Sequence, residues 1–111
     1  MFNFLKKNIS SEFVGLGNIR QDIHSHVLPG IDDGSPDIET SLQLVKGLHE
    51  LGITKMVATP HIIGDMYRNT PQIINNALQK LERAVSEAGL KTELSAAAEY
   101  MLDDYFMELL M

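Results

Sequence analysis

The chain has 111 residues, 44% hydrophobic and 22% charged, a composition typical of a soluble globular domain. Its net charge of −6 argues against a protein that binds nucleic acid or anionic membrane through a basic surface. Cysteine is absent, which excludes disulfides, thiolate zinc sites and a cysteine nucleophile. No apolar run approaches the ~20 residues that span a bilayer, so we expect no membrane insertion.

Residues 1–18 are expected to be an extension that precedes a domain over 19–111. The first seven residues mix apolar and basic side chains but lack the apolar core of a secretory signal. We interpret them as a short amphipathic segment that packs on the domain rather than as a membrane anchor. The expected location is the cytoplasm.

The first predicted strand covers residues 19–26, and a helix follows it. Ser35 is expected to cap this helix, Pro36 to occupy its first position and Asp37 to lie in its first turn. Apolar residues then recur at three- and four-residue spacing until Gly52, which is expected to end the helix.

The next three elements continue the alternation. A short apolar run over 55–61 predicts a parallel strand that is buried on both faces. A second amphipathic helix is predicted from Thr70 to Gly89, and a third strand over 91–99. Residues 100–111 indicate the beginning of another helix.

This order of strands and helices predicts an α/β fold with parallel strands. Two right-handed crossovers of this kind generate either an open doubly wound sheet or a sector of a (β/α) barrel. The small residues over 94–98 suit a strand inside a crowded barrel.

Histidines and an acid gather at the predicted carboxyl ends of the strands. His24 and His26 are two residues apart on an extended segment, so their side chains point to one face. His61 follows the second strand, and Glu99 ends the third. Because ligands bind at this rim of α/β folds, the four residues predict a metal site.

Other roles for these residues stay open at this point. Either histidine of the pair could be a hydrogen-bonded core residue, His61 could cap a turn, and Glu99 could pair with a basic residue. The segment Asp32-Asp33-Gly34 could supply a further metal ligand or be only a turn.

Two other polar residues are weaker candidates. Arg68 lies in the loop after the second strand, where it could clamp an anionic group or be an ordinary surface arginine. His49 is expected to be a solvated helix residue.

Imidazole and carboxylate ligands without thiolate suit manganese, iron, zinc, cobalt or nickel, and they disfavour an all-oxygen calcium site. Two or three such ions would lower the pKa of bound water and neutralise charge on a phosphoryl group. That chemistry, metal-dependent hydrolysis, needs no protein nucleophile.

With these motifs the sequence resembles the PHP (polymerase and histidinol phosphatase) family. More narrowly, it resembles the bacterial CpsB-like manganese-dependent tyrosine-protein phosphatases of capsular and exopolysaccharide biosynthesis. The first motif runs over 22–34 (Asp-Ile-His-Ser-His to Ile-Asp-Asp-Gly), the second over 58–61 (Ala-Thr-Pro-His) and the third over 97–103. The match covers roughly residues 20–110 in order and context.

The resemblance implies a fold, a cofactor and roles. The fold would be the N-terminal sector of an irregular (β/α)7 barrel with a trinuclear site, and the expected metal is Mn²⁺. His24, His26 and Glu99 would hold one ion, with Glu99 bridging to a second. Asp33, preferred over Asp32, would join His61 on the third. A metal-bridging hydroxide would attack the phosphorus of phosphotyrosine on a partner such as a capsule-biosynthesis tyrosine kinase.

The chain stops at Met111, before the family's later motifs: a further glutamate, a histidine near a phosphate-binding arginine, and a final Asp-x-His. We therefore expect a fragment that is inactive alone, with an unpaired strand edge and an apolar inner face. Such a fragment is expected to be poorly soluble, partly unfolded or associated with itself. The alternatives are a histidinol-phosphatase-like enzyme and a non-catalytic remnant or interaction module.

Overall fold

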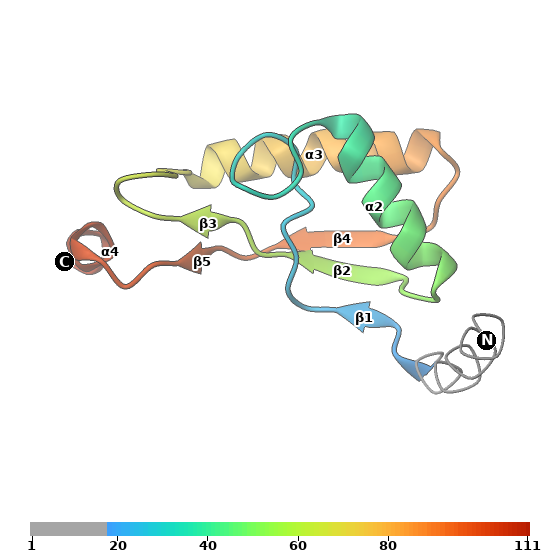
Figure 1. Cartoon of the computed structure of the whole chain (residues 1–111), viewed down its shortest axis with the longest axis horizontal. Helices are drawn as coiled ribbons and strands as arrows, with labels where there is room; N and C mark the ends of the chain where they lie inside the picture. Colours follow the sequence, from blue (N-terminus) through green and yellow to red (C-terminus); the bar gives the residue numbers. More distant parts are fainter. Residues whose placement is uncertain (1–17) are drawn as a thin grey trace, which may run out of the picture.

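A computed structural model describes residues 18–111, in which strands and helices alternate (Figure 1). A three-stranded parallel sheet has the order β1-β2-β4, and a second parallel pair joins β3 to β5. The α/β class with parallel strands is therefore confirmed. The elements are β1 (Gln21–Asp22), α2 (Ile38–Glu50), β2 (Lys55–Ala58), β3 (His61–Ile62), α3 (Pro71–Glu87), β4 (Glu93–Ala96), β5 (Glu99–Tyr100) and α4 (Asp104–Leu110).

The predicted second and third strands are each divided in two. Ala58 pairs with Ala96 at the end of the first ladder, and three residues later His61 pairs with Glu99 at the start of the second. Pro60 has no N–H to give to a ladder, which accounts for the break. The pairing keeps one register across it, so β3 and β5 continue the line of β2 and β4. The sequence had predicted that His61 and Glu99 end the second and third strands. They instead open a second ladder, as the first residues of β3 and β5.

Helix α2 is capped by a different residue from the one predicted. Asp37, not Ser35, is the N-cap, and its side chain accepts a hydrogen bond of 2.8 Å from the Thr40 N–H. The Ser35 hydroxyl instead donates to the carbonyl of Asp37 and contacts the hydroxyl of Ser41 at 2.7 Å. The helix ends before Gly52, whose φ of 96° lies in the left-handed region that favours glycine.

Helix α3 agrees with its predicted bounds. The Thr70 side chain accepts a hydrogen bond from the Ile73 N–H, and Pro71 opens the helix, where an amide is not needed. Its buried stripe repeats every three or four residues and comprises Ile74, Ala77, Leu81 and Val85.

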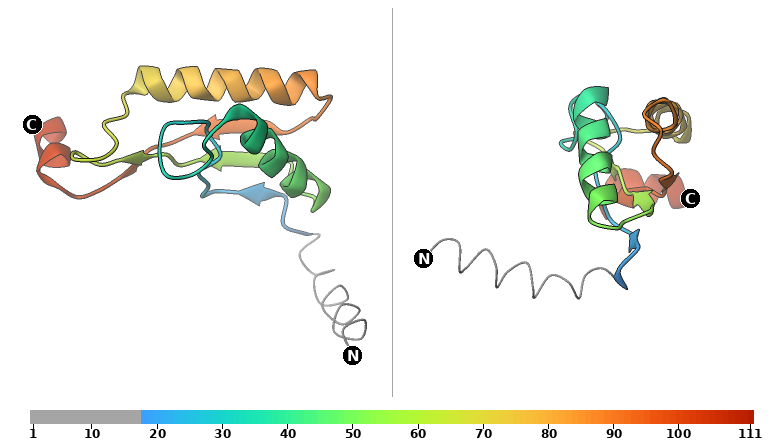
Figure 2. Two further views of the ribbon diagram at one scale, coloured as in Figure 1. Left: turned by 45° about the horizontal axis from the view of Figure 1, so that its top comes forward. Right: turned by 90° about the vertical axis from the view of Figure 1, so that its right-hand side faces the viewer.

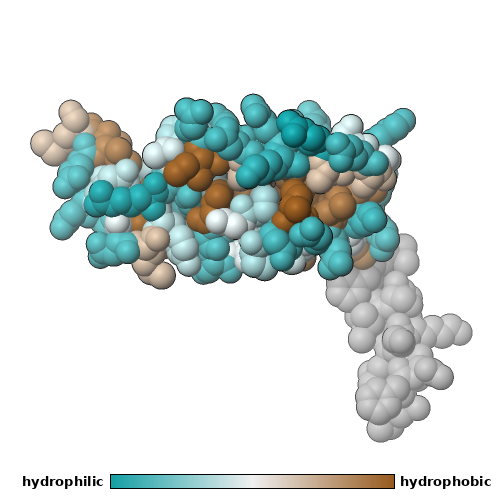
Figure 3. Space-filling view, turned by 90° about the horizontal axis from the view of Figure 1, so that it is seen from above, coloured by the Kyte–Doolittle hydropathy of each residue, from teal (hydrophilic) through white to brown (hydrophobic). Residues whose placement is uncertain are grey.

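The core lies between the two long helices and one face of the sheet. Both helices cover the same face of β1, β2 and β4 (Figures 1 and 2). Met56 and Ala58 of β2 point into this core and pack with Val45 of α2 and Leu81 of α3, all nearly inaccessible. The outer surface of the helices is mostly hydrophilic, with small apolar patches (Figure 3).

On the opposite face of the sheet, two predictions were wrong: that the second strand is buried on both faces, and that the exposed inner face is apolar. Strand β2 is not buried on both faces: Val57 is half-buried, and Lys55 is exposed. Nor is this face uniformly apolar, because Lys55 Nζ lies 3.6 Å from Glu93 Oε2 and Ser95 is exposed beside them. Strand side chains alternate between the two faces, so burying Met56 and Ala58 leaves their neighbours outside.

The first strand is shorter than predicted, because regular pairing stops at Asp22 and Ile23 is 71% exposed. The predicted last helix is present as α4, with Asp103 as its N-cap. The expected extension falls, except for Asn18, outside the described residues. Over 18–111, no helix is both long and apolar enough to span a bilayer.

Candidate metal centre

His24 and His26 lie on an extended segment just beyond β1. The residue between them fixes this segment against the end of β2, because the Thr59 N–H donates to the Ser25 carbonyl at 2.7 Å. The Ser25 N–H in turn donates to Thr59 Oγ1 at 3.2 Å. With Ser25 held toward β2, both imidazoles lie together, with ring centroids 5.2 Å apart.

His61 and Glu99 face each other across the β3–β5 ladder. They are register partners, and His61 Nδ1 lies 3.2 Å from Glu99 Oε2. Parallel pairing holds the two Cα atoms side by side, so the contact follows directly from the register. The His61 ring also lies 4.4 Å, between centroids, from the ring of His26.

One carboxylate oxygen is the focus of the site. Glu99 Oε2 lies 3.3 Å from His26 Nε2 and 3.8 Å from His24 Nε2, in addition to its contact with His61. The Glu99 side chain is 41% exposed, yet this oxygen is buried and has no hydrogen-bond partner among the described residues. An acceptor left in this state is costly unless a cation or proton satisfies it.

The donor set fits a divalent transition metal. Bonds of ~2.0–2.2 Å to one ion place neighbouring donor atoms roughly 3–3.5 Å apart. His24, His26 and Glu99 offer donor atoms that lie within 4.8 Å of one another, and so do His26, Asp33 and His61. Imidazole nitrogens and carboxylate oxygens without thiolate suit such ions.

The two adjacent aspartates have different surroundings. Asp33 is 63% exposed on its side chain, and its Oδ1 lies 3.3 Å from His61 Nε2. The side chain of Asp32 is only 1% exposed, and its Oδ2 lies 3.0 Å from His26 Nδ1. Asp32 also accepts hydrogen bonds from the backbone N–H groups of Gly34 and His61.

These contacts determine the charge state of Asp32. Burial by itself raises the pKa of the carboxyl group, because it disfavours the charged form. The hydrogen bonds from His26, Gly34 and His61, with the charge of His26, outweigh that effect and hold the pKa below its ordinary value of 3.8. Asp32 is therefore a carboxylate at neutral pH.

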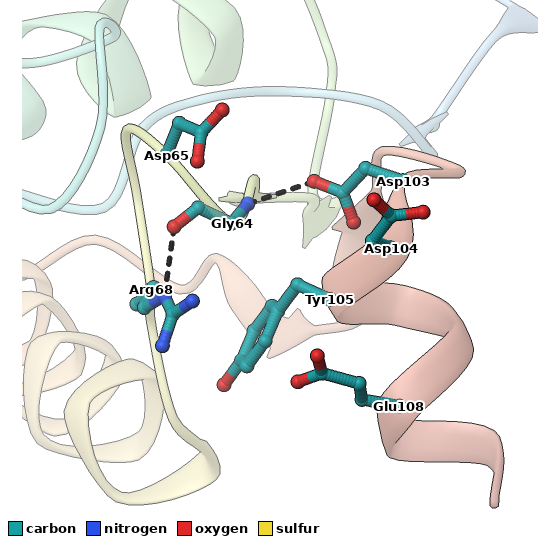
Figure 4. Close-up of a pocket in the computed structure, with 7 residues that line it drawn as sticks. All are labelled: Gly64, Asp65, Arg68, Asp103, Asp104, Tyr105 and Glu108. Carbon is teal, nitrogen blue, oxygen red and sulfur yellow. Dashed lines mark hydrogen bonds between the residues drawn. The ribbon is translucent and has the colours of Figure 1, made fainter.

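Arg68 is placed apart from the four converging residues. Its Nε donates to the Gly64 carbonyl at 2.7 Å, and its guanidinium carbon lies 4.4 Å from the centre of the Tyr105 ring. Figure 4 shows it in a pocket whose other side is formed by α4. The pocket is lined by Gly64, Asp65, Arg68, Asp103, Asp104, Tyr105 and Glu108.

Sequence reasoning missed one structural residue of the site. Asn69 is buried, and its side-chain amide donates to the carbonyls of Ile31 and His61, both at 2.9 Å. It thereby ties the Asp32–Asp33 loop to β3, a role that no local pattern indicates. His49, expected to be solvated, is half-buried and lies 3.3 Å from the Thr92 hydroxyl.

A scan against family models matches residues 20–111 to the family described as capsular polysaccharide synthesis, CpsB/CapC. Among curated proteins, the tyrosine-protein phosphatase YwqE of Bacillus subtilis is 36% identical over 62 residues, which are 56% of this chain and 24% of YwqE. CapC of Staphylococcus aureus is 30% identical over 87 residues, 78% of this chain and 34% of CapC. The chain thus spans about a quarter to a third of these relatives.

The chain is also similar in fold to a solved structure from the same group of proteins. It comes from crystal structures of YwqE from Bacillus subtilis and CpsB from Streptococcus pneumoniae, described as unique metal-dependent tyrosine phosphatases. The TM-score is 0.73 at 27% sequence identity, over 81% of this chain and 36% of the other. With a family model that covers nearly all of the described residues, this chain belongs to the CpsB/CapC family of capsular polysaccharide synthesis.

Proposed function

We propose that this chain supplies the metal-binding N-terminal sector, residues 19–111, of a metal-dependent phosphotyrosine phosphatase with an irregular (β/α)7 barrel. The observation that carries the proposal is the buried Glu99 oxygen, which has three imidazole nitrogens around it and no hydrogen-bond partner in the described part of the chain. Family membership and the names of the relatives support it. Cytoplasmic location stays a prediction.

In this proposal, His24, His26 and Glu99 hold one ion, and Asp33 with His61 contributes to another, with Mn²⁺ as the expected metal. Bound divalent ions supply an activated water and neutralise the charge of the phosphoryl group. The protein's own contacts hold the ligand atoms in place: the β3–β5 pairing for His61 and Glu99, and the Asp32 hydrogen bonds for His26 and His61. No side chain of the cluster has to act as a nucleophile, consistent with the absence of cysteine.

The neighbourhood of the cluster favours an aromatic phosphate ester over a small polar one. His61 and Glu99 border a pocket whose remaining lining is formed by Ile63, Tyr100, Met101 and Leu102. These largely apolar side chains suit the ring of phosphotyrosine on a protein such as a capsule-biosynthesis tyrosine kinase. Histidinol phosphate, the alternative substrate, would present a polar imidazole and an amine to this lining.

Because the chain spans only about a quarter to a third of its curated relatives, activity is best tested in a chimera. Residues 20–111 would replace the matching segment of YwqE from Bacillus subtilis, and hydrolysis would be measured with Mn²⁺ on p-nitrophenyl phosphate, a phosphotyrosyl peptide and histidinol phosphate. We expect turnover of the first two substrates, and loss of at least ~100-fold in kcat/KM on His24→Ala or His26→Ala.

The 111-residue chain is the second arm of this test. We expect it to bind Mn²⁺ measurably, by calorimetry and metal analysis, and to show no turnover alone. Arg68→Ala in the chimera tests the weaker prediction that this side chain contacts substrate, by a rise in KM. A chain that binds no metal, together with a folded but inactive chimera, would favour the non-catalytic remnant.

A further inference from the structure

The buried Asp32 carboxylate makes three hydrogen bonds, all to the loop and strand that carry the candidate ligands. Its Oδ1 accepts from the Gly34 N–H at 2.9 Å, and its Oδ2 accepts from the His61 N–H at 3.0 Å. His26 Nδ1 lies at the same distance from Oδ2. A buried charge with this many partners is held in one orientation.

We propose that Asp32 is a positioning residue that fixes the tautomer and the ring orientation of His26. The inference rests on the proposed metal site. Both ring nitrogens of His26 face carboxylate oxygens, which only accept. Nδ1 and Asp32 Oδ2 have hydrogen-bond geometry, whereas Glu99 Oε2 has no hydrogen-bond partner among residues 18–111, so the proton of a neutral His26 is assigned to Nδ1. The lone pair of the ring is then on Nε2, the atom that lies 3.3 Å from Glu99 Oε2. Only that tautomer offers Nε2 to a cation at the focus of the cluster.

The same carboxylate also sets the distance between the two imidazole-bearing segments. Its hydrogen bond to the His61 N–H spans 29 residues of sequence and joins the loop after β1 to the start of β3. The ring centroids of His26 and His61 lie 4.4 Å apart, and the ring planes are tilted by 30° to each other. One buried group thus positions the candidate ligands from two elements.

Gly34 is what lets the turn bring Asp32 so close. A Cβ at this position would lie 2.2 Å from the His26 carbonyl oxygen and 2.4 Å from the His26 Cβ. The Ser35 N–H closes the loop by donating to the same carbonyl at 3.0 Å. The Asp-Asp-Gly sequence therefore combines two tasks: an exposed candidate ligand at Asp33 and a buried orienting carboxylate at Asp32.

The test reads the tautomer directly in the metal-free full chain. Histidine side chains labelled with ¹⁵N report by NMR whether Nδ1, Nε2 or both carry a proton. We expect the Nδ1–H form for His26. In Asp32→Asn the amide replaces one acceptor by a donor, so the Nδ1–H population should fall, and Mn²⁺ affinity should decrease ~10–100-fold.

Asp33→Asn is the matched control, because it removes the neighbouring charge, which contacts His61, and keeps the hydrogen bond between Asp32 and His26 Nδ1. It should weaken Mn²⁺ binding but leave the tautomer of His26 unchanged. An Nε2–H tautomer in the unsubstituted chain would overturn the proposal, even if Asp32→Asn fails to fold. So would a tautomer that Asp32→Asn leaves unaltered. Failure of the unsubstituted chain to bind Mn²⁺ would count against the proposed function, whereas the tautomer result bears on Asp32 alone.

Discussion

At the scale of single residues, Glu99 can be replaced without breaking a hydrogen bond of its buried oxygen, because this oxygen makes none within residues 18–111. Its Oε2 has imidazole nitrogens at 3.2, 3.3 and 3.8 Å but no partner with hydrogen-bond geometry within residues 18–111. Stability is commonly lower at functional sites, where groups are arranged for a ligand rather than for the fold. Glu99 therefore allows a test that separates folding from metal binding.

We expect Glu99→Gln to leave the metal-free chain as stable as the original or slightly more stable. The amide can donate to an imidazole nitrogen, and the buried charge is gone. The same change should abolish most of the stabilisation by Mn²⁺, which amounts to ~2.7 kcal/mol when the free ion is at 100 times its Kd. Thermal denaturation with and without Mn²⁺ measures both effects. A lower melting temperature without metal, or an undiminished shift with it, would contradict this interpretation.

The convergence of the four residues could be predicted from sequence, but not which aspartate does what. His24 and His26 follow β1, and His61 and Glu99 come three residues after the ends of β2 and β4. These strands run parallel, and the carboxyl ends of parallel strands share one rim. Asp32 and Asp33 differ only in contacts made across the fold, above all the hydrogen bond to the His61 N–H. No local pattern encodes that contact.

At the scale of elements, Asp103 connects α4 to the rest of the chain. Its Oδ2 accepts from the Gly64 N–H at 2.8 Å, and its Oδ1 from the Phe106 N–H at 2.9 Å. The approach is close, because a Cβ on Gly64 would lie 2.7 Å from the Tyr105 Cβ. Arg68 adds its contact with the Tyr105 ring. Asp103 is thus both the cap of α4 and its tie to the segment after β3.

This tie should depend on pH in a defined direction. The hydrogen bonds from the Gly64 and Phe106 N–H groups, with the charge of Arg68, lower the pKa of Asp103 below 3.8 against a small opposing effect of burial. The stabilisation is present above the unfolded value and is lost as pH falls through the lower folded pKa. The amide proton shifts of Gly64 and Phe106 should titrate with a midpoint below 3.8. A midpoint at or above that value would contradict the interpretation.

Substitution tests the same tie at neutral pH. Asp103 accepts the two hydrogen bonds on different oxygens, and in Asp103→Asn only one of these positions keeps an acceptor. The amide of Gly64 or of Phe106 should therefore exchange faster with solvent. Asp104→Asn is the control, because it lies in the first turn of α4 but outside both bonds. Equal exchange rates in the two variants would show that Asp103 does not hold the helix.

Helix positions were predictable because their signals are local, whereas strand ends were not. Thr70 and Pro71 mark the start of α3, and its apolar stripe lies within the seventeen residues of the helix. The division of the second strand follows from Pro60, but its continuation as β3 depends on pairing with β5. Asp37 displaced Ser35 as the cap of α2 because the Ser35 hydroxyl is committed to Ser41 and to the carbonyl of Asp37.

At the scale of the whole molecule, the described residues form a layer with one covered face and open borders. Strands β1 and β4 lie at the two edges of the sheet, and both long helices cover the same face (Figure 2). Beyond the sheet, α4 exposes Met107, Leu109 and Leu110 by 55%, 53% and 65%. Figure 3 shows apolar atoms at this end of the molecule. Exposed apolar surface and unpaired strand edges both favour association.

We therefore expect the isolated chain to associate rather than to remain a monodisperse monomer. Light scattering coupled to size exclusion, over a range of concentrations, should give masses above the 12.4 kDa of one chain. Leu109→Gln with Leu110→Gln should shift the distribution toward the monomer, because both side chains are exposed and their loss removes apolar surface without opening the core.

The source of association can be identified with a matched control. Leu44→Gln on α2 removes a side chain of similar exposure, 45%, from the hydrophilic outer surface and should leave the masses unchanged. If the α4 variant associates as before, we would infer that two copies associate through the edges of β1 and β4. Edge strands offer unpaired N–H and C=O groups to a second copy. A sharp, cooperative melt from a monomer at every concentration would contradict both routes, because it would mean that one covered face is enough to make this sector stable alone.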